Sequence, residues 1–204
     1  MLARTLPYFM VATILVMAAV LPASAAVEVG KPAPAIQATD INGNEFNLSD
    51  HQGKIVVLEW TNHDCPFVVK HYDSGNMQKL QNEAREMGVE WVTIVSSAPG
   101  KQGHVSAEEA MKIMEEAGAN PTTKILDESG EIGKAYDAKT TPHMFVIDED
   151  GNVAYAGAID SDSSPRQSAI EGADNYVMAA VESLKAGEEV AVKTSAPYGC
   201  SVKY

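Results

Sequence analysis

Two cysteines are the residues of this chain best suited to covalent chemistry. Cys65 follows a strongly apolar run, residues 55–58, after a short polar stretch, and Pro66 comes directly after it. Cys200 lies close to the C-terminal end, and the sequence contains no other cysteine. A cysteine at the start of a helix faces unpaired backbone N–H groups and the positive end of the helix dipole. Both lower the thiol pKa and favour the nucleophilic thiolate.

The neighbours of Cys65 act on this thiol in opposite directions. Pro66 suits the first turn of a helix, because a proline there gives up an N–H that has no helical partner. His63 adds positive charge when it is protonated, whereas Asp64 opposes the thiolate, so the sign of their sum stays open. We expect Asp64 to act as the helix N-cap. The alternative for Cys65 itself is a buried, inert thiol.

Cys200 is the only internal partner that the sequence offers to Cys65. Val68 stands where a CxxC motif would carry its second cysteine. The interpretations left open for Cys200 are a reversible resolving thiol, a static structural disulfide, and no pairing with Cys65. An oxidising compartment favours either kind of bond.

The N-terminal residues have the layout of a cleaved secretory signal. Arg4 precedes an uncharged apolar stretch, residues 6–21, and the small residues 23–25 supply a cleavage site. The stretch is short for a membrane span, although an uncleaved anchor is the alternative. We therefore expect residues 1–25 to be a signal peptide cleaved after Ala25. The mature protein is expected to be periplasmic or secreted, without stable membrane insertion.

The charge of the chain argues against polyanionic partners. The formal net charge is −13, and removal of residues 1–25, whose only charged side chain is Arg4, makes it −14. So acidic a domain is a poor binder of nucleic acid and of anionic lipid. Residues 26–187 suit one domain with a sizeable core, and residues 188–204 form a tail with little local pattern that carries Cys200.

Hydrophobic periodicity alternates repeatedly between strand and helix patterns, which is typical of an α/β domain. The turn pairs Asn42-Gly43 and Asp150-Gly151 each predict a hairpin. The loop 96–103 follows a buried parallel strand, so we expect it on the same rim as Cys65. The pattern predicts strands at 55–60, 89–95, 124–126, 143–148 and 153–158, and helices over 66–87 with a loosened middle at 74–76, over 106–117, 129–136 and 173–184.

Several of these segments resemble one family. Residues 29–34, residues 48–54 and the strand leading into Cys65 and Pro66 resemble the redoxin branch of the thioredoxin superfamily, which includes the alkyl hydroperoxide reductase and thiol-specific antioxidant proteins. Residues 140–142 resemble the cis-proline loop of that fold, and residues 198–204 resemble the tail of a bacterial peroxiredoxin-like subgroup. The resemblance implies an α/β thioredoxin-like fold over residues 26–187, with a central mixed β-sheet flanked by helices and an extra N-terminal β-hairpin.

The resemblance also implies the substrate-binding residues. In thioredoxin-like proteins the cis-proline loop faces the active cysteine and offers backbone groups to a bound peptide, a role that falls here to Thr141 and Pro142. We expect Asn62 and Pro66 to complete the binding site. Asn62 departs from the peroxiredoxin pattern, which has a threonine or serine in its place; its amide is then the group left to donate to the thiolate. His143 is expected to be a satisfied core or edge histidine.

The predicted function is that of an exported thiol oxidoreductase of the peroxiredoxin-like redoxin type. Cys65 is expected to attack a peroxide or a disulfide substrate, with resolution by Cys200 or by an external thiol reductant. The alternatives are a thiol-disulfide reductase or isomerase without CxxC, acting on a protein disulfide partner, and a non-catalytic thiol-dependent binding or copper-delivery module. No metal site or cofactor is predicted, because the His63-x-Cys65 pair lacks further ligands at compact spacing.

Overall fold

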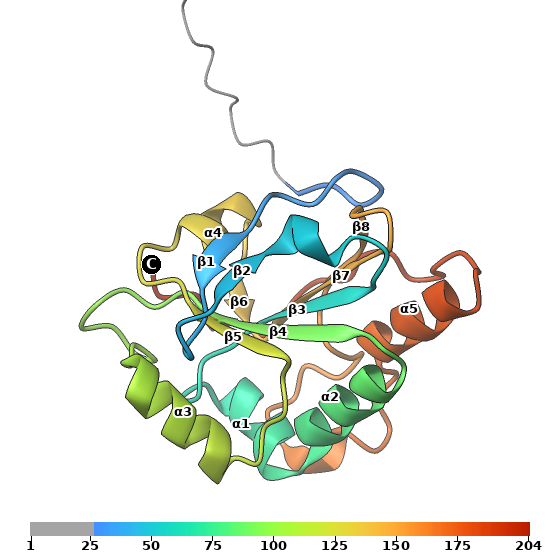
Figure 1. The fold of residues 1–204 in the computed structure, drawn as a ribbon. Coiled ribbons are helices and arrows are strands. Elements are labelled where there is room, and N and C mark those ends of the chain that lie inside the picture. The colour runs from blue at the N-terminus through green and yellow to red at the C-terminus, as the bar shows by residue number, and fades with distance from the viewer. Residues whose placement is uncertain (1–26) are drawn as a thin grey trace, which may run out of the picture.

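The computed structural model describes residues 27–204, so the expected signal peptide over residues 1–25 lies outside the described residues. Five strands form the central sheet, in the order β5-β4-β3-β7-β8 (Figure 1). Strands β3, β4 and β5 are mutually parallel, whereas β7 runs antiparallel to β3, and β8 runs antiparallel to β7. The bounds are β3 (Val56–Trp60), β4 (Glu90–Val95), β5 (Thr123–Leu126), β7 (His143–Ile147) and β8 (Val153–Gly157). The sheet is mixed, as expected.

Two apolar cores cover the two faces of this sheet. Successive strand residues point to opposite faces, so Val57 packs in one core and Leu58 in the other. The first core joins the sheet to helices α2 (Asn76–Glu86) and α5 (Tyr176–Lys185). β3 and β4 are therefore near-continuous apolar runs, as strands buried on both faces are.

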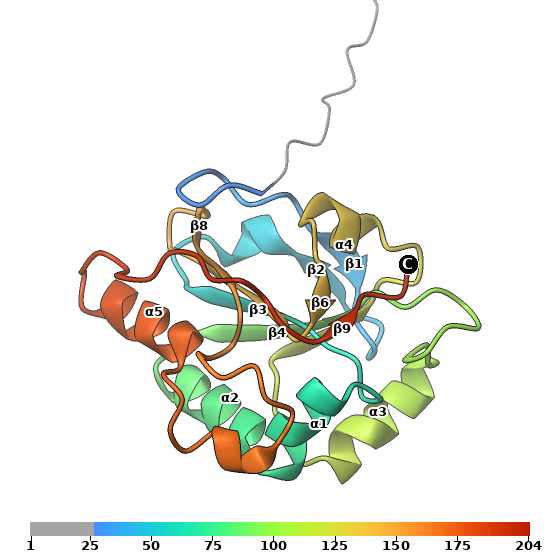
Figure 2. The ribbon, with the colours of Figure 1, turned by 180° about the vertical axis from the view of Figure 1, so that it is seen from behind.

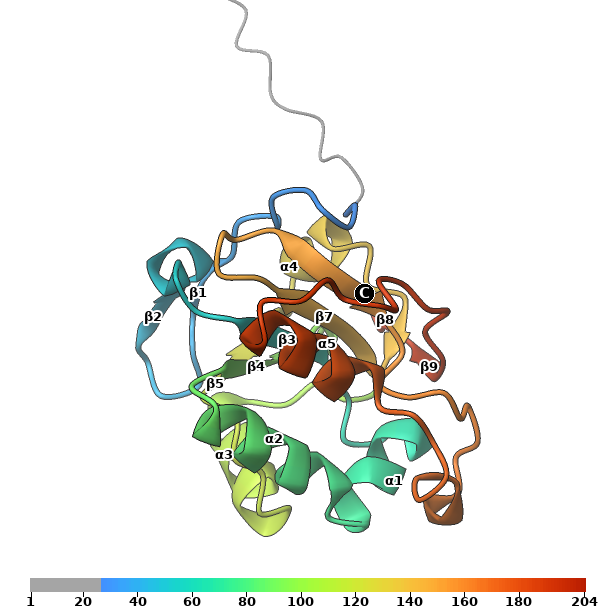
Figure 3. The same ribbon diagram turned by 90° about the vertical axis from the view of Figure 1, so that its right-hand side faces the viewer.

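Helices α1, α2 and α3 lie on one side of the sheet, and the N-terminal hairpin and α4 lie on the other (Figure 3). The hairpin turns where Asn42-Gly43 predicted it, because the Asp40 carboxylate accepts hydrogen bonds from the backbone N–H groups of Asn42 and Asn44. The elements on the two sides are β1 (Gln37–Thr39), β2 (Glu45–Asn47), the 3-10 helix η1 (Leu48–His51), α1 (Pro66–Asp73), α3 (Ala107–Glu116), α4 (Glu131–Ala135) and the 3-10 helix η2 (Gln167–Ala169).

The helix ends follow the local capping chemistry. The loosened middle expected at 74–76 is a break between α1 and α2, where Gly75 takes a left-handed conformation, with φ +75°. Ser106 and Glu109 form a reciprocal capping box at the start of α3. The last helix begins later than predicted from residue 173, because Asn175 accepts a hydrogen bond from the N–H of Met178 and caps the helix there.

The C-terminal tail takes a fixed path over the domain, although its sequence shows little local pattern. It first pairs with β8, where the N–H of Ala156 donates to the carbonyl of Lys193 over 3.1 Å. It then forms β9 (Cys200–Ser201), which runs antiparallel to the short strand β6 (Thr140–Thr141) (Figure 2). Its end reaches the loop after β4, where the N–H of Ala98 donates to Lys203. The tail is held by partners far away in the sequence.

Candidate active site

Cys65 lies where β3 ends and α1 begins, and its side chain is buried. The residue that caps α1 is Cys65, in extended conformation, so the expectation that Asp64 is the N-cap is wrong. The reason is Pro66, which occupies the first helical position and keeps the residue before it extended. The helix therefore starts one residue later, and its first-turn N–H groups lie at the cysteine.

Cys200 meets Cys65 across the β6–β9 pair. In this pair Cys200 lies opposite Thr141, and the Sγ atoms of the two cysteines are 2.7 Å apart. Both thiols are free. As a protonated thiol, Cys65 donates from Sγ to the carbonyl oxygen of Thr141 over 3.0 Å. Two thiols separated by 135 residues of sequence are thus in position to form a disulfide with little movement.

The two thiols differ in acidity. Burial raises the pKa of Cys65, but the hydrogen bond from Cys200 and further hydrogen bonds outweigh burial and hold this pKa below its ordinary value. Burial and the neighbouring Cys65 raise the pKa of Cys200 to about 11. A thiolate therefore forms more readily at Cys65 than at Cys200.

The loop that faces the sulfurs contains a cis peptide bond between Thr141 and Pro142, as the family resemblance implies. Thr141 is buried, and its backbone already pairs with Cys200. Gly199 packs against the same place: a Cβ added to it would lie 2.0 Å from the carbonyl oxygen of Thr141. The backbone groups expected to receive a substrate are thus covered by the tail.

Asn62 is buried and holds the segment that leads into Cys65. Its Oδ1 accepts from the N–H of Asp64 over 3.0 Å, and its Nδ2 donates to the carbonyl of Gln102 over 3.3 Å. Gln102 donates in turn to the carbonyl of Asp64. These contacts place the loop 96–103 on the rim beside Cys65, as expected. They also occupy the side-chain amide of Asn62, which we expected to donate to the Cys65 thiolate. Pro66 is exposed at the start of α1.

A buried polar cluster that the sequence did not predict anchors the tail next to Cys200. The hydroxyl of Tyr198 donates to the Asp160 carboxylate and lies 3.5 Å from Nε2 of His71. The ammonium of Lys70 lies 4.0 Å from the Asp160 carboxylate and 4.9 Å from the centre of the Tyr198 ring. Lys70 and His71 lie on α1, whose N-cap is Cys65, but the sequence carried no signal that both side chains are buried.

Burial shifts the acidity of this cluster strongly. Burial and the adjacent Lys70 lower the pKa of His71 to about 3, so its imidazole is neutral. Burial raises the pKa of Asp160 and lowers that of Lys70. His143, expected as a satisfied core histidine, is buried, accepts a hydrogen bond from the N–H of Lys139, and has its pKa lowered to about 4 by burial.

The part of the chain that the structure describes contains neither a cluster of metal ligands nor a membrane-spanning helix. Within residues 27–204, no three His, Cys, Asp or Glu side chains gather in a way that would hold a metal ion. None of the helices in this part of the chain is both long enough and apolar enough to cross a membrane.

Comparison with known proteins identifies the family of this chain. The family model described as Redoxin matches residues 28–173. The chain belongs to the Redoxin family. A thiol-disulfide oxidoreductase ResA from Bacillus thuringiensis subsp. konkukian (strain 97-27) is 29% identical over 126 residues, which cover 62% of this chain and 67% of the relative. This redoxin is thus similar to a protein named for thiol-disulfide chemistry, in agreement with the expectation of a thiol-dependent oxidoreductase.

Solved structures show the same architecture. An uncharacterized conserved protein from Geobacillus kaustophilus is 31% identical, with a TM-score of 0.75, and the match covers 87% of this redoxin and 92% of that chain. The thioredoxin domain of a thiol-disulfide oxidoreductase from Bacteroides vulgatus is 20% identical, with a TM-score of 0.53, and the match covers 72% and 97%. The second likeness concerns the fold alone, which is thioredoxin-like.

Proposed function

We propose that this redoxin is an exported thiol-disulfide oxidoreductase in which Cys65 is the nucleophile and Cys200 is the resolving thiol. The observation that carries the proposal is the 2.7 Å separation of the two sulfurs, together with their opposite acidities. A nucleophile must be a thiolate at working pH, and Cys65 is the more acidic of the two thiols. Export rests on the signal-like pattern of residues 1–25.

The steps follow from thiol-disulfide exchange. The Cys65 thiolate attacks one sulfur of a partner disulfide, a bond forms between Cys65 and that sulfur, and the other partner sulfur leaves as a thiolate. Cys200 then gives its proton to the departed thiolate and attacks the sulfur of Cys65. The mixed disulfide breaks, and its partner sulfur leaves as a thiolate that takes a proton from water. The partner is thus released as a dithiol, and a Cys65–Cys200 disulfide remains. An external thiol reductant then reduces the Cys65–Cys200 disulfide and restores both thiols.

Access to Cys65 requires the tail to move. Cys65 is completely buried, and the backbone of residues 199–201 covers the Thr141 side of the site. A partner polypeptide reaches the sulfur only after this part of the tail leaves β6. In this scheme Thr141 and Pro142 then receive the partner, while Asn62 and Pro66 hold the segment that presents Cys65.

A hydroperoxide is the second candidate substrate, and the burial of Cys65 favours it, because a small oxidant needs less opening than a polypeptide. The thiolate attacks one peroxide oxygen, the O–O bond breaks, and the leaving oxygen takes up a proton as alcohol or water. Cys200 then attacks the sulfenic acid of Cys65, and water leaves as the disulfide forms. Both candidates end in the same Cys65–Cys200 bond.

The test uses the reduced protein and two matched variants, Cys65→Ser and Cys200→Ser. With oxidised glutathione, we expect wild type to form the internal disulfide, Cys200→Ser to accumulate a mixed disulfide at Cys65, and Cys65→Ser to react far more slowly. Peptide mapping under non-reducing conditions identifies each bond. A bond that forms only between chains, or equal reactivity of the two variants, refutes the assigned roles. Parallel assays of peroxide consumption and insulin disulfide reduction then separate the two substrates.

A further inference from the structure

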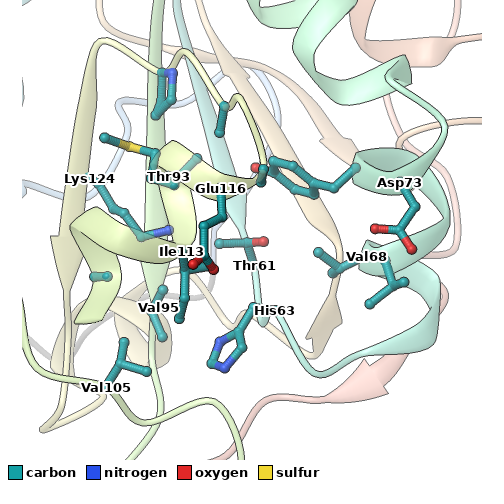
Figure 4. Close-up of a pocket in the computed structure, with 17 residues that line it drawn as sticks. Thr61, His63, Val68, Asp73, Thr93, Val95, Val105, Ile113, Glu116 and Lys124 are labelled. Atoms are coloured by element: carbon teal, nitrogen blue, oxygen red, sulfur yellow. The ribbon is translucent and has the colours of Figure 1, made fainter.

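A cavity of about 370 Å³ lies beside the active-site helix, between α1, α3 and the β4–β5 side of the sheet (Figure 4). Its volume is within the range of small-molecule sites. Its walls are mainly apolar and come from several elements, among them Val68 on α1, Val95 on β4, Val105 before α3, and Ile113 and Met114 on α3.

One cation reaches into this apolar cavity. Lys124 extends from β5 toward the middle of the space (Figure 4). Its position follows from strand register, since Glu59 lies opposite Thr93 and Thr93 lies opposite Lys124. These three residues form a polar row across one face of β3, β4 and β5, a face that is otherwise largely apolar.

The two charges at the ends of this row differ in how they are satisfied. The Glu59 carboxylate accepts hydrogen bonds from Tyr72 Oη over 2.9 Å and from Trp91 Nε1 over 2.8 Å. Among the residues that the structure describes, no hydrogen bond or ion pair joins the Lys124 ammonium to an acceptor. Burial lowers the pKa of Lys124, and the charge of Glu59 partly offsets the effect. The Lys124 side chain is half-buried and lines the cavity.

We propose that this cavity binds a small organic monocarboxylate, with its carboxylate on Lys124 and its apolar body against the side chains of α3 and β4. A carboxylate supplies the acceptor that the ammonium lacks, and the pair gains strength from the water-poor surroundings. Asp73 and Glu116 also line the cavity, and Glu116 is exposed. Their negative charge disfavours ligands with a second anionic group, so the site selects a single charge on an apolar body.

The site is distinct from the thiol chemistry but adjacent to it. Thr61, His63 and Val68 line the cavity and lie within four residues of Cys65. A carboxylate bound to Lys124 would therefore lie beside the segment that leads into Cys65. Neither cysteine lines the cavity. Binding does not depend on the roles proposed for the two cysteines, and the test below does not measure thiol exchange.

The test measures binding of sodium octanoate to the full reduced protein by isothermal titration calorimetry, with octanamide as the uncharged isostere. Wild type is expected to bind octanoate at least tenfold more tightly than octanamide. Lys124→Met is expected to lose this preference, whereas Lys101→Met, which removes a loop lysine away from the cavity, is expected to keep it. Equal binding of the two ligands to wild type, no octanoate binding, or full preference in Lys124→Met overturns the proposal.

A second variant locates the ligand without changing the charge. Ile113→Trp fills the cavity from α3 and is expected to weaken octanoate and octanamide alike, by about tenfold. Unchanged affinity for both would place the ligand elsewhere and overturn the site. The comparison of octanoate with octanamide on wild type stands even where a variant does not fold.

Discussion

Substitution of Gly199 by alanine tests whether the tail is held on β6 as described. Gly199 has φ +136° and packs against the carbonyl oxygen of Thr141. An alanine Cβ would lie 2.0 Å from this oxygen, whereas an ordinary C···O contact is at least about 3.3 Å. The tail and the loop must therefore separate by about 1.3 Å, and the positive φ adds strain of its own. The variant cannot keep the β6–β9 pairing unchanged.

The size of the effect follows from the two redox states. Overpacking at a close contact costs about 1 to 3 kcal/mol. The reduced variant avoids this cost by releasing the tail, but the disulfide form cannot, because the bond between Cys65 and Cys200 keeps Gly199 near Thr141. The substitution therefore destabilises the oxidised form selectively. We expect the disulfide to become easier to reduce by about tenfold to a hundredfold, or by about 30 to 60 mV for this two-electron couple.

The assay equilibrates the protein in glutathione buffers of defined ratio, traps free thiols by alkylation and counts them by mass spectrometry. Gly187→Ala is the matched control, because Gly187 also has positive φ, +70°, and a Cβ there would meet nothing within 4 Å. We expect the disulfide of Gly187→Ala to be reduced at the same glutathione ratio as that of wild type. If the disulfide of Gly199→Ala is also reduced at the wild-type glutathione ratio, the close packing of the tail on Thr141 is refuted.

Three further predictions concern the buried polar groups. The alkylation rate of Cys65 should rise with pH around a midpoint below the ordinary ~8.5, and Cys200→Ala should move this midpoint upward, because it removes the hydrogen bond that stabilises the thiolate; an unchanged midpoint contradicts that role. Tyr198→Phe should lower the free energy of unfolding in urea by about 1 to 3 kcal/mol, because Asp160 loses a buried donor; wild-type stability would show that this contact does not hold the tail. Burial raises the pKa of Glu59 above its ordinary value of 4.5, so the folded state binds a proton that the unfolded state has released, and stability falls as pH rises above 4.5 through the folded pKa. Glu59→Gln should reduce this loss in urea titrations between pH 4.5 and 7, and an identical pH dependence would contradict the assignment.

The alternation of patterns in the sequence was sufficient to predict the order of the main elements. Buried strands read as continuous apolar runs, and the glycine-containing pairs marked both hairpins, because these signals are local. The strands β6 and β9 were not predicted. Each has two residues, too few to show a period, and each exists only because the other lies beside it. The path of the tail could not be predicted either, because it depends on pairing with segments that lie far away in the sequence.

In the candidate site, too, residues with a local sequence signal were predicted, and residues whose surroundings come from distant parts of the chain were not. Cys65 stood out through its position after a buried strand. Cys200 stood out because it is the only other cysteine of the sequence and because residues 198–204 resemble the tail of a peroxiredoxin-like subgroup. Lys124 and Lys70 did not stand out, because a lysine in a strand or a helix is normally solvated and the chain that buries each of them lies far away in the sequence. The error at Asp64 has a local cause: we weighed the capping preference of aspartate above the extended conformation that Pro66 imposes on the residue before it.

The position of Val68 explains why the second thiol comes from the tail. In a CxxC protein this position, three residues after the first cysteine, carries the resolving thiol on the first turn of the same helix. Here Val68 is buried and lines the apolar cavity, so that side of Cys65 is occupied by packing. Cys200 approaches Cys65 on the strand β9, where its pairing partner is Thr141. The proposed resolving thiol and a partner polypeptide therefore compete for the same backbone groups. In the proposed cycle, return of the tail both forms the internal disulfide and displaces the partner from Thr141.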